Sequence, residues 1–344
     1  MNIVSQETML EARRKYTGTT KIPFLYGGKT EYADKKIVNG EMETLKFGKP
    51  LGEMITYGGS NVSKELLRKV VLDVELGREE VQPLYKPIYD TISDSNLPEV
   101  LDAKWALRGA CVFAQSFEGS EVHFGTLEAE YGPTARINTY TAGFEYTKQI
   151  RDFNQSFQVE MLNKAMGEAY NALLNELYLG PILKATYKAA NQTAVQKAAD
   201  GEPAFVTLYS TIKAALKQTI VKKRPATVML ASKANQLDIE QALRGGYTFN
   251  GTTLPAITGI STIIYYDGWT QTTGKKTTTY DGVPADKIYL IRPKRGFKEL
   301  VKQDLRIEAN AGDLSRLVEQ QIVGYAYRGV FAAIDENVQE VTIA

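Results

Sequence analysis

The stretch GGKT at residues 27–30 is the first part of the sequence whose residue types and spacing could do chemistry. Gly-Lys-Thr ends the phosphate-binding loop of many nucleotide-binding proteins, in which backbone N–H groups hold the phosphates. That loop needs another glycine five residues before Gly28, and Pro23 occupies this position. Without it the backbone amides cannot form the phosphate cradle, so we interpret the stretch as a turn.

Cys111 and His123 are the only cysteine and the only histidine. They could face each other across a hairpin as nucleophile and base, but the sequence GACVFA around Cys111 is typical of a small buried hydrophobic residue. A single histidine excludes a two-histidine metal site within one chain, and a single cysteine excludes an intrachain disulfide. We therefore expect no metal and no cofactor.

Four carboxylates could form a hydrolytic pair. Glu128 and Glu130 would share one face of a strand, and Glu118 and Glu121 lie close by in the sequence. A hairpin that faces solvent or a partner explains these residues equally well, and nothing in the sequence marks a surrounding cleft. We do not expect catalysis here.

Two further segments suggest ligand binding. The basic stretch KKRPAT at 222–227 would place three cations at a helix C-terminus, where they either stabilise the helix dipole or form a patch for nucleic acid. Tyr265, Tyr266 and Trp269 could stack on a carbohydrate or a base. We favour the helix cap for the first segment and a strand that enters a turn for the second.

Composition excludes several classes of protein. The 41 basic and 40 acidic residues give a net charge of +1, so no global field attracts nucleic acid or an acidic membrane. No run of about 18 apolar residues occurs, and the N-terminus is charged where a signal peptide is apolar. We expect a protein made in the cytoplasm, with no membrane as partner.

The first hundred residues predict an extended arm with little core of its own. A short helix is expected in 5–16, and the segment to about residue 60 is rich in glycine and turn dipeptides. The apolar residues from Val62 to Val74 have helical spacing, which predicts a second helix. Prolines between residues 83 and 98 favour an extended chain after it.

Residues 108–149 predict a long β-hairpin followed by a long helix. EYGPTARINTYT, residues 130–141, has the alternation of one hairpin arm, but too few large apolar residues on either face to enter a core. Apolar residues then recur every four positions from Phe153 to Leu177, up to Gly180 and Pro181, which we expect to end the helix. At about 28 residues this helix would be on the order of 40 Å long.

The pattern beyond residue 203 changes to alternating helices and strands. Helices are expected in 208–220 and 232–245, the second capped by Ser232, and buried strands in ATVMLA and ISTIIYYD. The remaining segments predict β-strands, and they read DKIYLIRP, DLRIEAN, QIVGYAYRGVFAAID and QEVTIA. This alternation favours a compact layered domain.

This order of elements resembles the major capsid proteins of tailed bacteriophages, which have the α+β Hong Kong 97-type fold. The resemblance rests on EGSEVHFGTLEAEYGPTARINTYTAGFEYTKQI leading into RDFNQSFQVEMLNKAMGEAYNALLNELYLG, and on KRPATVMLASKANQLDIEQAL followed by GISTIIYYD. It covers nearly the whole chain. It implies an N-terminal arm and linking helix in 1–107, an extended hairpin loop in 108–150, a peripheral domain with a long spine helix in 151–202, an axial domain in 203–295 and a β-return in 296–344.

The resemblance also implies a function. Members of this family assemble with copies of themselves, as pentamers and hexamers, into an icosahedral shell. The shell encloses double-stranded DNA without sequence-specific binding, is assembled in the host cytoplasm and becomes the virion capsid. Scaffolding, portal and decoration proteins are further partners of such shells. The resemblance implies no enzymatic activity.

Ile137, Tyr140, Phe144 and Tyr146 are the contact residues that the resemblance implies. The hairpin would lie across the neighbouring subunit and bury these four side chains there, which would explain why it lacks a core of its own. The arm around residues 20–60 would bind a further subunit. On this basis Ile137→Asp or Tyr140→Asp is expected to block shells and leave a folded subunit.

Two alternatives remain open. An encapsulin-like nanocompartment shell shares the architecture, with a shorter arm expected. An α/β hydrolytic enzyme with its catalytic body in 203–295 belongs to a different class, and it requires a pocket with a nucleophile, a base and an orienting group. The size of the purified particle separates shells from an enzyme, and nucleic acid content separates a virus from an encapsulin.

Overall fold

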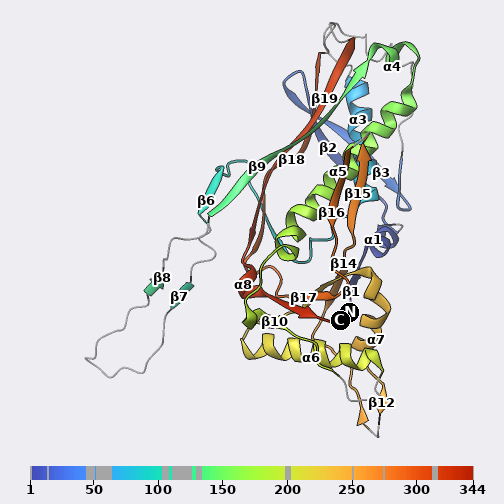
Figure 1. The fold of residues 1–344 in the computed structure, drawn as a ribbon. Helices are drawn as coiled ribbons and strands as arrows, with labels where there is room; N and C mark the ends of the chain where they lie inside the picture. Colours follow the sequence, from blue (N-terminus) through green and yellow to red (C-terminus); the bar gives the residue numbers. More distant parts are fainter. Residues whose placement is uncertain are drawn as a thin grey trace.

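A computed structural model shows an elongated molecule with two parts (Figure 1). It describes residues 2–13, 15–43, 51, 64–102, 108–110, 126–128, 134–197, 203–249, 252–273, 276–311 and 317–343. A compact part holds a six-stranded sheet and two helices, and an elongated part holds a five-stranded sheet, two long helices and a hairpin.

The compact part is built on a mixed sheet with the strand order β1-β14-β11-β17-β20-β10. The bounds are Asn2–Val4 for β1, Thr262–Tyr265 for β14, Val228–Ala231 for β11, Lys287–Ile291 for β17, Val338–Thr342 for β20 and Gln192–Thr193 for β10. Every residue of β11 is buried, because both faces of the sheet are covered.

Each face of this sheet has its own cover. Met229 and Ala231 of β11 pack in one cluster with the helices α6 (Ala204–Val221) and α7 (Gln236–Arg244). Val228 and Leu230 alternate with these two residues along the strand, so they face the opposite side of the sheet, where they pack in a second cluster with the C-terminal end of α5. The short elements η3 (Lys233–Asn235), β12 (Thr248–Phe249) and β13 (Thr252–Thr253) complete this region.

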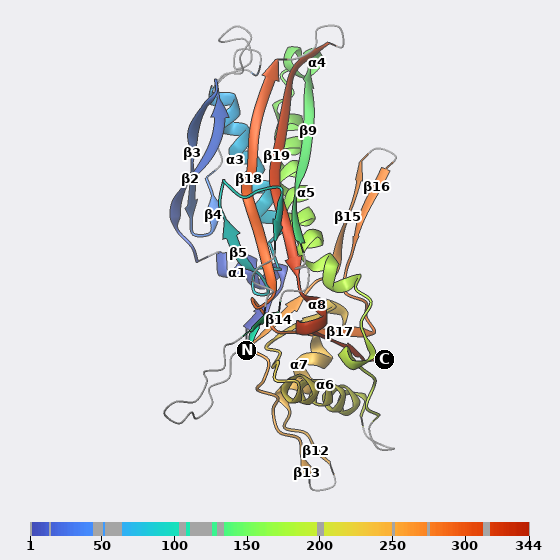
Figure 2. The same cartoon turned by 90° about the vertical axis from the view of Figure 1, so that its left-hand side faces the viewer.

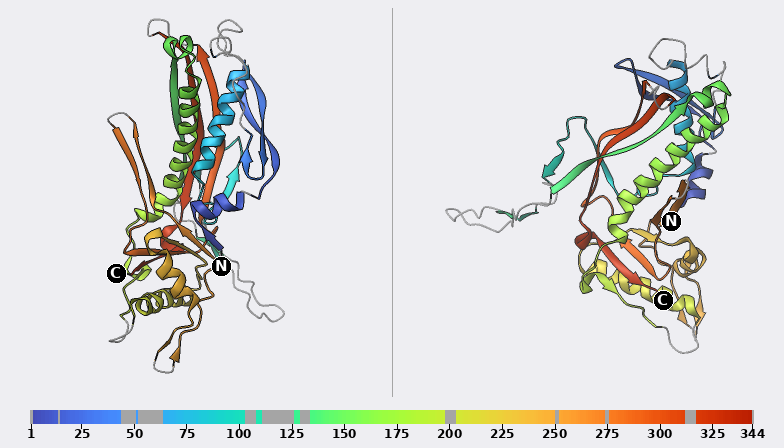
Figure 3. Two further views of the ribbon diagram at one scale, coloured as in Figure 1. Left: turned by 90° about the vertical axis from the view of Figure 1, so that its right-hand side faces the viewer. Right: turned by 45° about the horizontal axis from the view of Figure 1, so that its top comes forward.

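The elongated part has a sheet with the order β5-β18-β19-β9-β6. Figure 2 shows the two long strands, β18 and β19, running side by side along this part. The bounds are Asp90–Ser93 for β5, Phe297–Ala311 for β18, Val318–Ala332 for β19, Thr134–Thr147 for β9 and Val100–Asp102 for β6. The hairpin β15 (Gly268–Thr273) with β16 (Lys276–Asp281) projects beside α5 (Figure 3).

Two helices pack together along this sheet. They are α3 (Lys64–Glu80) and α5 (Ser156–Leu183), and α5 is about 42 Å long at 1.5 Å per residue over its 28 residues. A hairpin of β2 (Gly18–Tyr26) and β3 (Lys29–Val38), extended by β4 (Glu41–Met42), packs beside α3. The remaining short elements are α1 (Gln6–Arg13), β7 (Arg108–Ala110), β8 (Thr126–Glu128), α4 (Lys148–Asp152), η2 (Ala189–Asn191) and α8 (Ile334–Asn337).

The helices and tail strands expected from the sequence are present, but α5 does not end where the sequence predicts. It continues past Gly180 and Pro181 to Leu183. A proline in a helix removes one backbone hydrogen bond, and here the loss falls in the last turn. The backbone N–H of Lys184 still donates to the carbonyl oxygen of Gly180 at 2.9 Å, so the helix closes normally.

The N-terminal segment also differs from the predicted loose arm. Residues 2–4 form the edge strand β1 of the compact sheet, in parallel with β14. Phe24 and Ala33 of the β2–β3 hairpin are fully buried against α3. Residues 2–4 and 18–42 therefore enter cores for which the compact sheet and α3 supply the apolar surface, although the sequence predicts little core in this segment by itself.

Strand β9 shows the largest departure from the predicted hairpin. It pairs with β19 over most of its length and with β6 on its other side, so it lies inside the sheet. The shorter ladder β7–β8 pairs residues 108–110 with 126–128, as a hairpin there requires. The sequence reading of a strand without a core in its own chain is wrong, since β19 comes from a distant part of the sequence.

Candidate functional site

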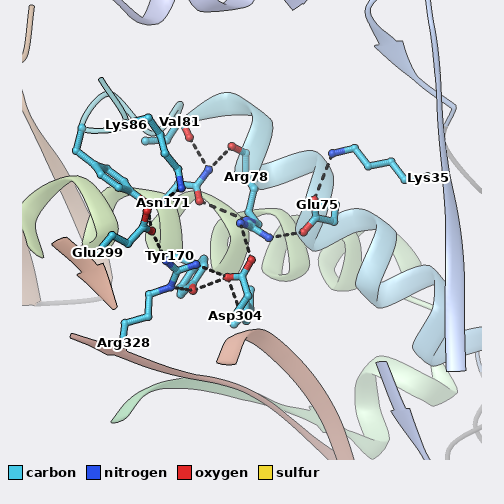
Figure 4. Close-up of polar contacts among 12 residues, drawn as sticks. Lys35, Glu75, Arg78, Val81, Lys86, Tyr170, Asn171, Glu299, Asp304 and Arg328 are labelled. Atoms are coloured by element: carbon cyan, nitrogen blue, oxygen red, sulfur yellow. Dashed lines mark hydrogen bonds and ion pairs between the residues drawn. The ribbon is translucent and has the colours of Figure 1, made fainter. Parts of the chain in front are cut away.

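A group of polar side chains, three of them buried, lies where α3, α5, β18 and β19 meet (Figure 4). We call it the polar junction, and its members are Arg78, Tyr170, Glu299, Asp304 and Arg328. Arg328 bonds to three of the others: its Nη1 lies 2.5 Å from Oε1 of Glu299, its Nη2 2.6 Å from Oδ1 of Asp304, and its Nε donates to the hydroxyl of Tyr170 at 2.9 Å. Arg328 therefore holds residues of α5 and β18 together.

The second arginine of the polar junction connects it to α3. The Nη2 of Arg78 lies 3.6 Å from Oδ2 of Asp304, and its Nη1 lies 2.6 Å from Oε1 of Glu75. The Nε of Arg78 also donates to Oδ1 of Asn171 on α5 at 3.3 Å. Lys35 of the hairpin lies 3.2 Å from Oε2 of Glu75 and extends the chain of charges outward.

Glu299 is the most completely buried member, with no exposed side-chain surface. Tyr85, Thr91 and Lys86 donate to its two oxygens at 2.7, 2.7 and 3.0 Å. Burial raises the pKa of this carboxyl, but these hydrogen bonds and the charge of Lys86 outweigh burial and hold the pKa below its ordinary value.

The same balance governs Asp304. Although its side chain is 52 % exposed, its carboxyl group is partly desolvated, which raises its pKa, but the guanidinium groups of Arg78 and Arg328 act more strongly together and lower it. Both carboxylates are therefore ionised at neutral pH, and each faces at least one arginine. For the fully buried Glu299, a charge without such partners would cost several kcal/mol.

The polar junction stabilises the fold and has no sign of catalytic use. All the interactions given above join its side chains to one another or to neighbouring elements, and its arginines have carboxylate partners. Both carboxylates are ionised at neutral pH, so neither can act as a general acid, and their oxygens already accept from arginine, lysine, tyrosine and threonine side chains of the chain itself. The junction fixes α3 and α5 on the sheet.

The feature most suited to binding a partner is an apolar stripe at the N-terminal end of α5, made of Phe153, Phe157 and Met161. These side chains are 70 %, 70 % and 56 % exposed. Phe157 and Met161 are four residues apart and therefore lie on one face of α5, while Phe153 lies just before this helix, at the C-terminal cap of α4. Neighbouring large apolar side chains that face water are uncommon on monomers and mark interaction sites.

The four predicted contact residues lie on β9, and the structure divides them. Ile137 is 7 % exposed and packs in a cluster with Leu300 and Phe331, and Tyr146 is fully buried. Phe144 is partly buried beside Tyr146, with ring centroids 5.3 Å apart, and Tyr140 is also partly buried. Burial of Ile137 and Tyr146 within their own chain corrects the expectation that only a neighbour covers them. Whether the four also contact another subunit stays a prediction.

The GGKT stretch is a hairpin turn, as expected. Tyr26 pairs with Lys29 across the two glycines, which have φ values of 56° and 76°. Only residues that tolerate positive φ fit such a two-residue turn. Among the other candidates, Cys111, Glu118, Glu121, His123 and Glu130 lie outside the described residues, and Glu128 is described only as part of the backbone of β8.

The aromatic candidates belong to the fold. Tyr265 and Tyr266 are 3 % and 4 % exposed, so neither offers a face for stacking on a ligand. Trp269 stacks on Tyr280 of the neighbouring strand at a centroid distance of 5.6 Å. The favoured interpretation, a strand end that enters a turn, agrees with β14 ending at Tyr265 and β15 beginning at Gly268.

The basic stretch 222–224 lies at the C-terminus of α6, as expected: Lys222 is the cap residue, and the backbone N–H groups of Lys222 and Arg224 donate to the carbonyl oxygens of Gln218 and Thr219 at 3.1 and 2.9 Å. The Nζ of Lys222 donates to Oδ1 of Asn191 at 3.1 Å, and Nη1 of Arg224 donates to the carbonyl oxygen of Glu336 at 3.2 Å. These side chains reach toward η2 and α8, away from the helix end.

Sequence reasoning missed the polar junction. The only feature of the sequence that could have indicated these residues is a charged residue within an apolar run, such as Arg328 in GYAYRGVFA and Glu299 in FKELV. Such a residue in a strand predicts a buried pair but does not identify the partner. In the described part of the chain, no group of three or more histidine, cysteine or acidic residues could hold a metal ion. The helices in that part are too short or too polar to cross a membrane.

Comparison with known proteins gives a result for structure alone. No protein-family profile matches the sequence, and no curated protein matches it. The mature capsid of bacteriophage PhiM1 is similar in fold, with a TM-score of 0.53 and 10 % sequence identity over 75 % of this chain and 86 % of that one. The capsid of Myoviridae phage XM1 has a TM-score of 0.48 and 12 % identity over 75 % of this chain and 90 % of that one.

A third similar structure is a virus-like particle from Pyrococcus furiosus, with a TM-score of 0.48 and 12 % identity over 80 % of this chain and 99 % of that one. The match to the PhiM1 capsid shows that the chain has the Hong Kong 97-type capsid fold, an α+β fold, as the order of elements in the sequence predicts.

Proposed function

We propose that this chain, which has the Hong Kong 97-type fold, is a major capsid protein that self-assembles into the icosahedral shell of a tailed bacteriophage around double-stranded DNA. The proposal includes pentamers and hexamers as the units of assembly and the virion capsid as the final location. Scaffolding, portal and decoration proteins are its proposed further partners. It assigns the chain no enzymatic activity.

The apolar stripe is the observation that carries the proposal. Phe153 and Phe157 are each 70 % exposed, just before and in the first turn of α5, the helix whose Tyr170 bonds to Asp304 and Arg328 in the polar junction. Burying two phenylalanines would contribute about 3–6 kcal/mol at an interface. A shell subunit makes several such contacts at once, so closed assemblies are stable even when each contact is weak.

The elongated shape supports the same reading. The β18–β19 ribbon and α5 run the length of one part, and the compact part lies at one end of it (Figures 1 and 2). The buried charges of the polar junction fasten these elements together, which gives a stiff body able to impose a fixed angle on its neighbours. The predicted contacts of Tyr140 and Phe144 on β9 remain part of this proposal.

Negative-stain electron microscopy of the expressed full chain, alone and with neighbouring gene products, tests the proposal. Closed shells or uniform rings support it, and double-stranded DNA inside particles from infected cells identifies a bacteriophage capsid. Shells filled with a cargo protein and free of DNA would assign an encapsulin-like compartment instead. A monodisperse monomer under all conditions would contradict both kinds of shell and would favour the alternative of an α/β hydrolytic enzyme.

A further inference from the structure

A group of cations gathers where the end of α6 meets the turn between β17 and β18. We call it the basic patch, and its members are Lys222, Lys223, Arg224, Arg292, Lys294 and Arg295. None is fully buried, and Lys223, Lys294 and Arg295 are exposed. Figure 1 shows α6, β17 and α8 close together in the compact part, and Arg224 and Arg292, from two distant segments, bond to consecutive residues of α8.

Contacts with α8 and β20 hold these cations in place. Arg224 donates from Nη1 to the carbonyl oxygen of Glu336 at 3.2 Å. The backbone N–H of Arg292 donates to the carbonyl oxygen of Asn337 at 2.9 Å. The Nζ of Lys222 donates to Oε1 of Gln339 at 3.2 Å. Two charged side chains and the backbone of Arg292 therefore lie against one short stretch of α8 and β20, and these bonds to uncharged oxygens leave the positive charges uncompensated.

Carboxylates do not neutralise the basic patch. Within the described part of the chain, no ion pair joins any of its six cations to an Asp or Glu side chain. Asp335 of α8 lies at its margin but is paired with Lys188 at 2.7 Å. Glu336 also lies on α8, and six cations against this one carboxylate leave an excess of five positive charges.

The pKa values of two members show that the cations act on one another. Burial lowers the pKa of Arg292, and the charges of Arg295 and Arg224 lower it further. Burial and the charge of Arg224 likewise lower the pKa of Lys222. Like charges held at such separations destabilise the chain, and an anion bound among them would relieve the repulsion.

The sequence extends the positive charge along α6. Residues 203–237 contain six cations and no Asp or Glu, although the whole chain has a net charge of only +1. Lys213 and Lys217 are exposed on α6, nine and five residues before Lys222, the first residue of the basic patch. From Lys213 to Val221, where α6 ends and the basic patch begins, the helix rises about 12 Å at 1.5 Å per residue. An extended polyanion matches this row of cations better than a single phosphate.

We infer that the basic patch, continued by Lys213 and Lys217, binds the phosphate backbone of double-stranded DNA. The inference rests on the proposed function in the choice of ligand, because DNA is the polyanion that such a shell encloses. Lysine and arginine contacts to phosphates carry no sequence information. Binding is therefore expected to be independent of base sequence and to weaken steeply with salt.

The alternative occupant is an acidic protein segment. Ile220 and Val221 are 63 % and 72 % exposed beside the patch, and they could anchor such a segment. Cations outnumber these two apolar residues by a wide margin along α6 and the β17–β18 turn, which favours the phosphate backbone. The experiment compares the two occupants directly.

The test measures binding of a short fluorescent DNA duplex of mixed sequence to the purified full chain by anisotropy, between about 50 and 200 mM salt. The patch variant is Arg224→Gln/Arg292→Gln/Arg295→Gln. A matched control, Lys36→Gln/Lys64→Gln/Arg68→Gln, removes the same charge from the elongated part, where the three side chains are 58 %, 51 % and 42 % exposed. The single exposed variant Arg295→Gln guards against misfolding of the triple variant.

We expect the patch variant to bind at least about tenfold more weakly than the control and to flatten the slope of log affinity against log salt by about 0.9 for each lost phosphate contact. Equal affinities and slopes for the two variants would overturn the inference. So would displacement of the duplex by polyglutamate at a lower charge concentration than by unlabelled DNA.

Electron microscopy of the same preparations separates this inference from the proposed function. DNA binding that is lost in the patch variant of a chain that never forms shells would support the DNA site and contradict the capsid proposal. Shells with no difference in DNA binding between the two variants would contradict the DNA site alone.

Discussion

Gly77 of α3 and Gly167 of α5 face each other where the two helices come closest. A Cβ atom added to Gly77 would lie 2.0 Å from the carbonyl oxygen of Lys164, and one added to Gly167 would lie 2.0 Å from that of Val74. No side chain larger than hydrogen fits at either position without moving a backbone. This close approach brings Arg78 of α3 within reach of Asn171 and Asp304.

Gly77→Ala and Gly167→Ala are therefore each expected to destabilise the chain. Overpacking costs typically about 1–3 kcal/mol, more than the roughly 1 kcal/mol that alanine adds in helix propensity. The double variant should lose less than the sum, because one separation of the helices accommodates both methyl groups. Urea unfolding of unassembled subunits, followed by circular dichroism, measures all three free energies.

Gly180→Ala is the matched control on the same helix. The nearest atom to its added Cβ is a carboxylate oxygen of the flexible Glu176 side chain, at 3.2 Å. This variant should be neutral or up to about 1 kcal/mol more stable. Destabilisation by Gly180→Ala equal to that by Gly77→Ala would show that loss of glycine, and not the helix contact, sets the cost.

Glu299→Gln tests the polar junction. The substitution removes the negative charge that faces Arg328. It also replaces one carboxylate oxygen by an NH2 group, which cannot accept the two hydrogen bonds that this oxygen now accepts. Lys86 and Thr91 donate to Oε2, and Tyr85 and Arg328 donate to Oε1. Breaking a buried ion pair on one side costs about 3–5 kcal/mol. We expect a loss in this range in urea unfolding, and Lys36→Gln, which removes an exposed ion pair, should change the free energy of unfolding by less than about 1 kcal/mol.

The pH dependence of stability follows from the same carboxylates. The pKa values of Glu299 and Asp304 are lower in the folded chain than their ordinary values of 4.5 and 3.8. Their contribution is therefore complete above about pH 4.5 and is lost as the pH falls through the lowered folded pKa values. In Glu299→Gln the free energy of unfolding should fall less steeply below pH 4.5 than in the unsubstituted chain. Parallel curves would show that Glu299 does not carry the effect.

The sequence predicts local elements well and contacts between distant segments poorly. The four-residue repeat from Phe153 to Leu177 predicts α5, because helix periodicity is local. Burial of Ile137 and Tyr146 could not be found in the same way, since it depends on β19, which begins more than 170 residues later. Arg328 and Glu299 likewise meet only after β18 and β19 pair. The pairing of distant strands decides which residues become partners, and a short window of sequence holds no information about that pairing.

Tyr146→Phe distinguishes the chain's own core from a subunit contact. The Tyr146 hydroxyl lies 3.1 Å from Oδ1 of Asn163, which in turn donates to buried Asp73 at 3.1 Å. Removing the hydroxyl leaves a buried acceptor without its donor, at a cost of about 1–3 kcal/mol. Ile137→Asp should destabilise more strongly, by placing a carboxylate in an apolar cluster. Both losses should appear in urea unfolding of unassembled subunits, and unchanged unfolding with blocked shells would restore the original reading of β9.

Phe157→Glu tests the apolar stripe as an assembly surface. The side chain is 70 % exposed, so the charge should change the free energy of unfolding by no more than about 0.5 kcal/mol, while a buried contact with a neighbour would be abolished. Leu237→Glu, at 81 % exposure on α7, is the control for adding an exposed charge elsewhere. We expect shells from Leu237→Glu and only dispersed subunits or open rings from Phe157→Glu by electron microscopy. Because both variants should unfold like the unsubstituted chain, a shell yield that is equal for the two would show that the stripe stays exposed in the assembly and that the contacts between subunits lie elsewhere.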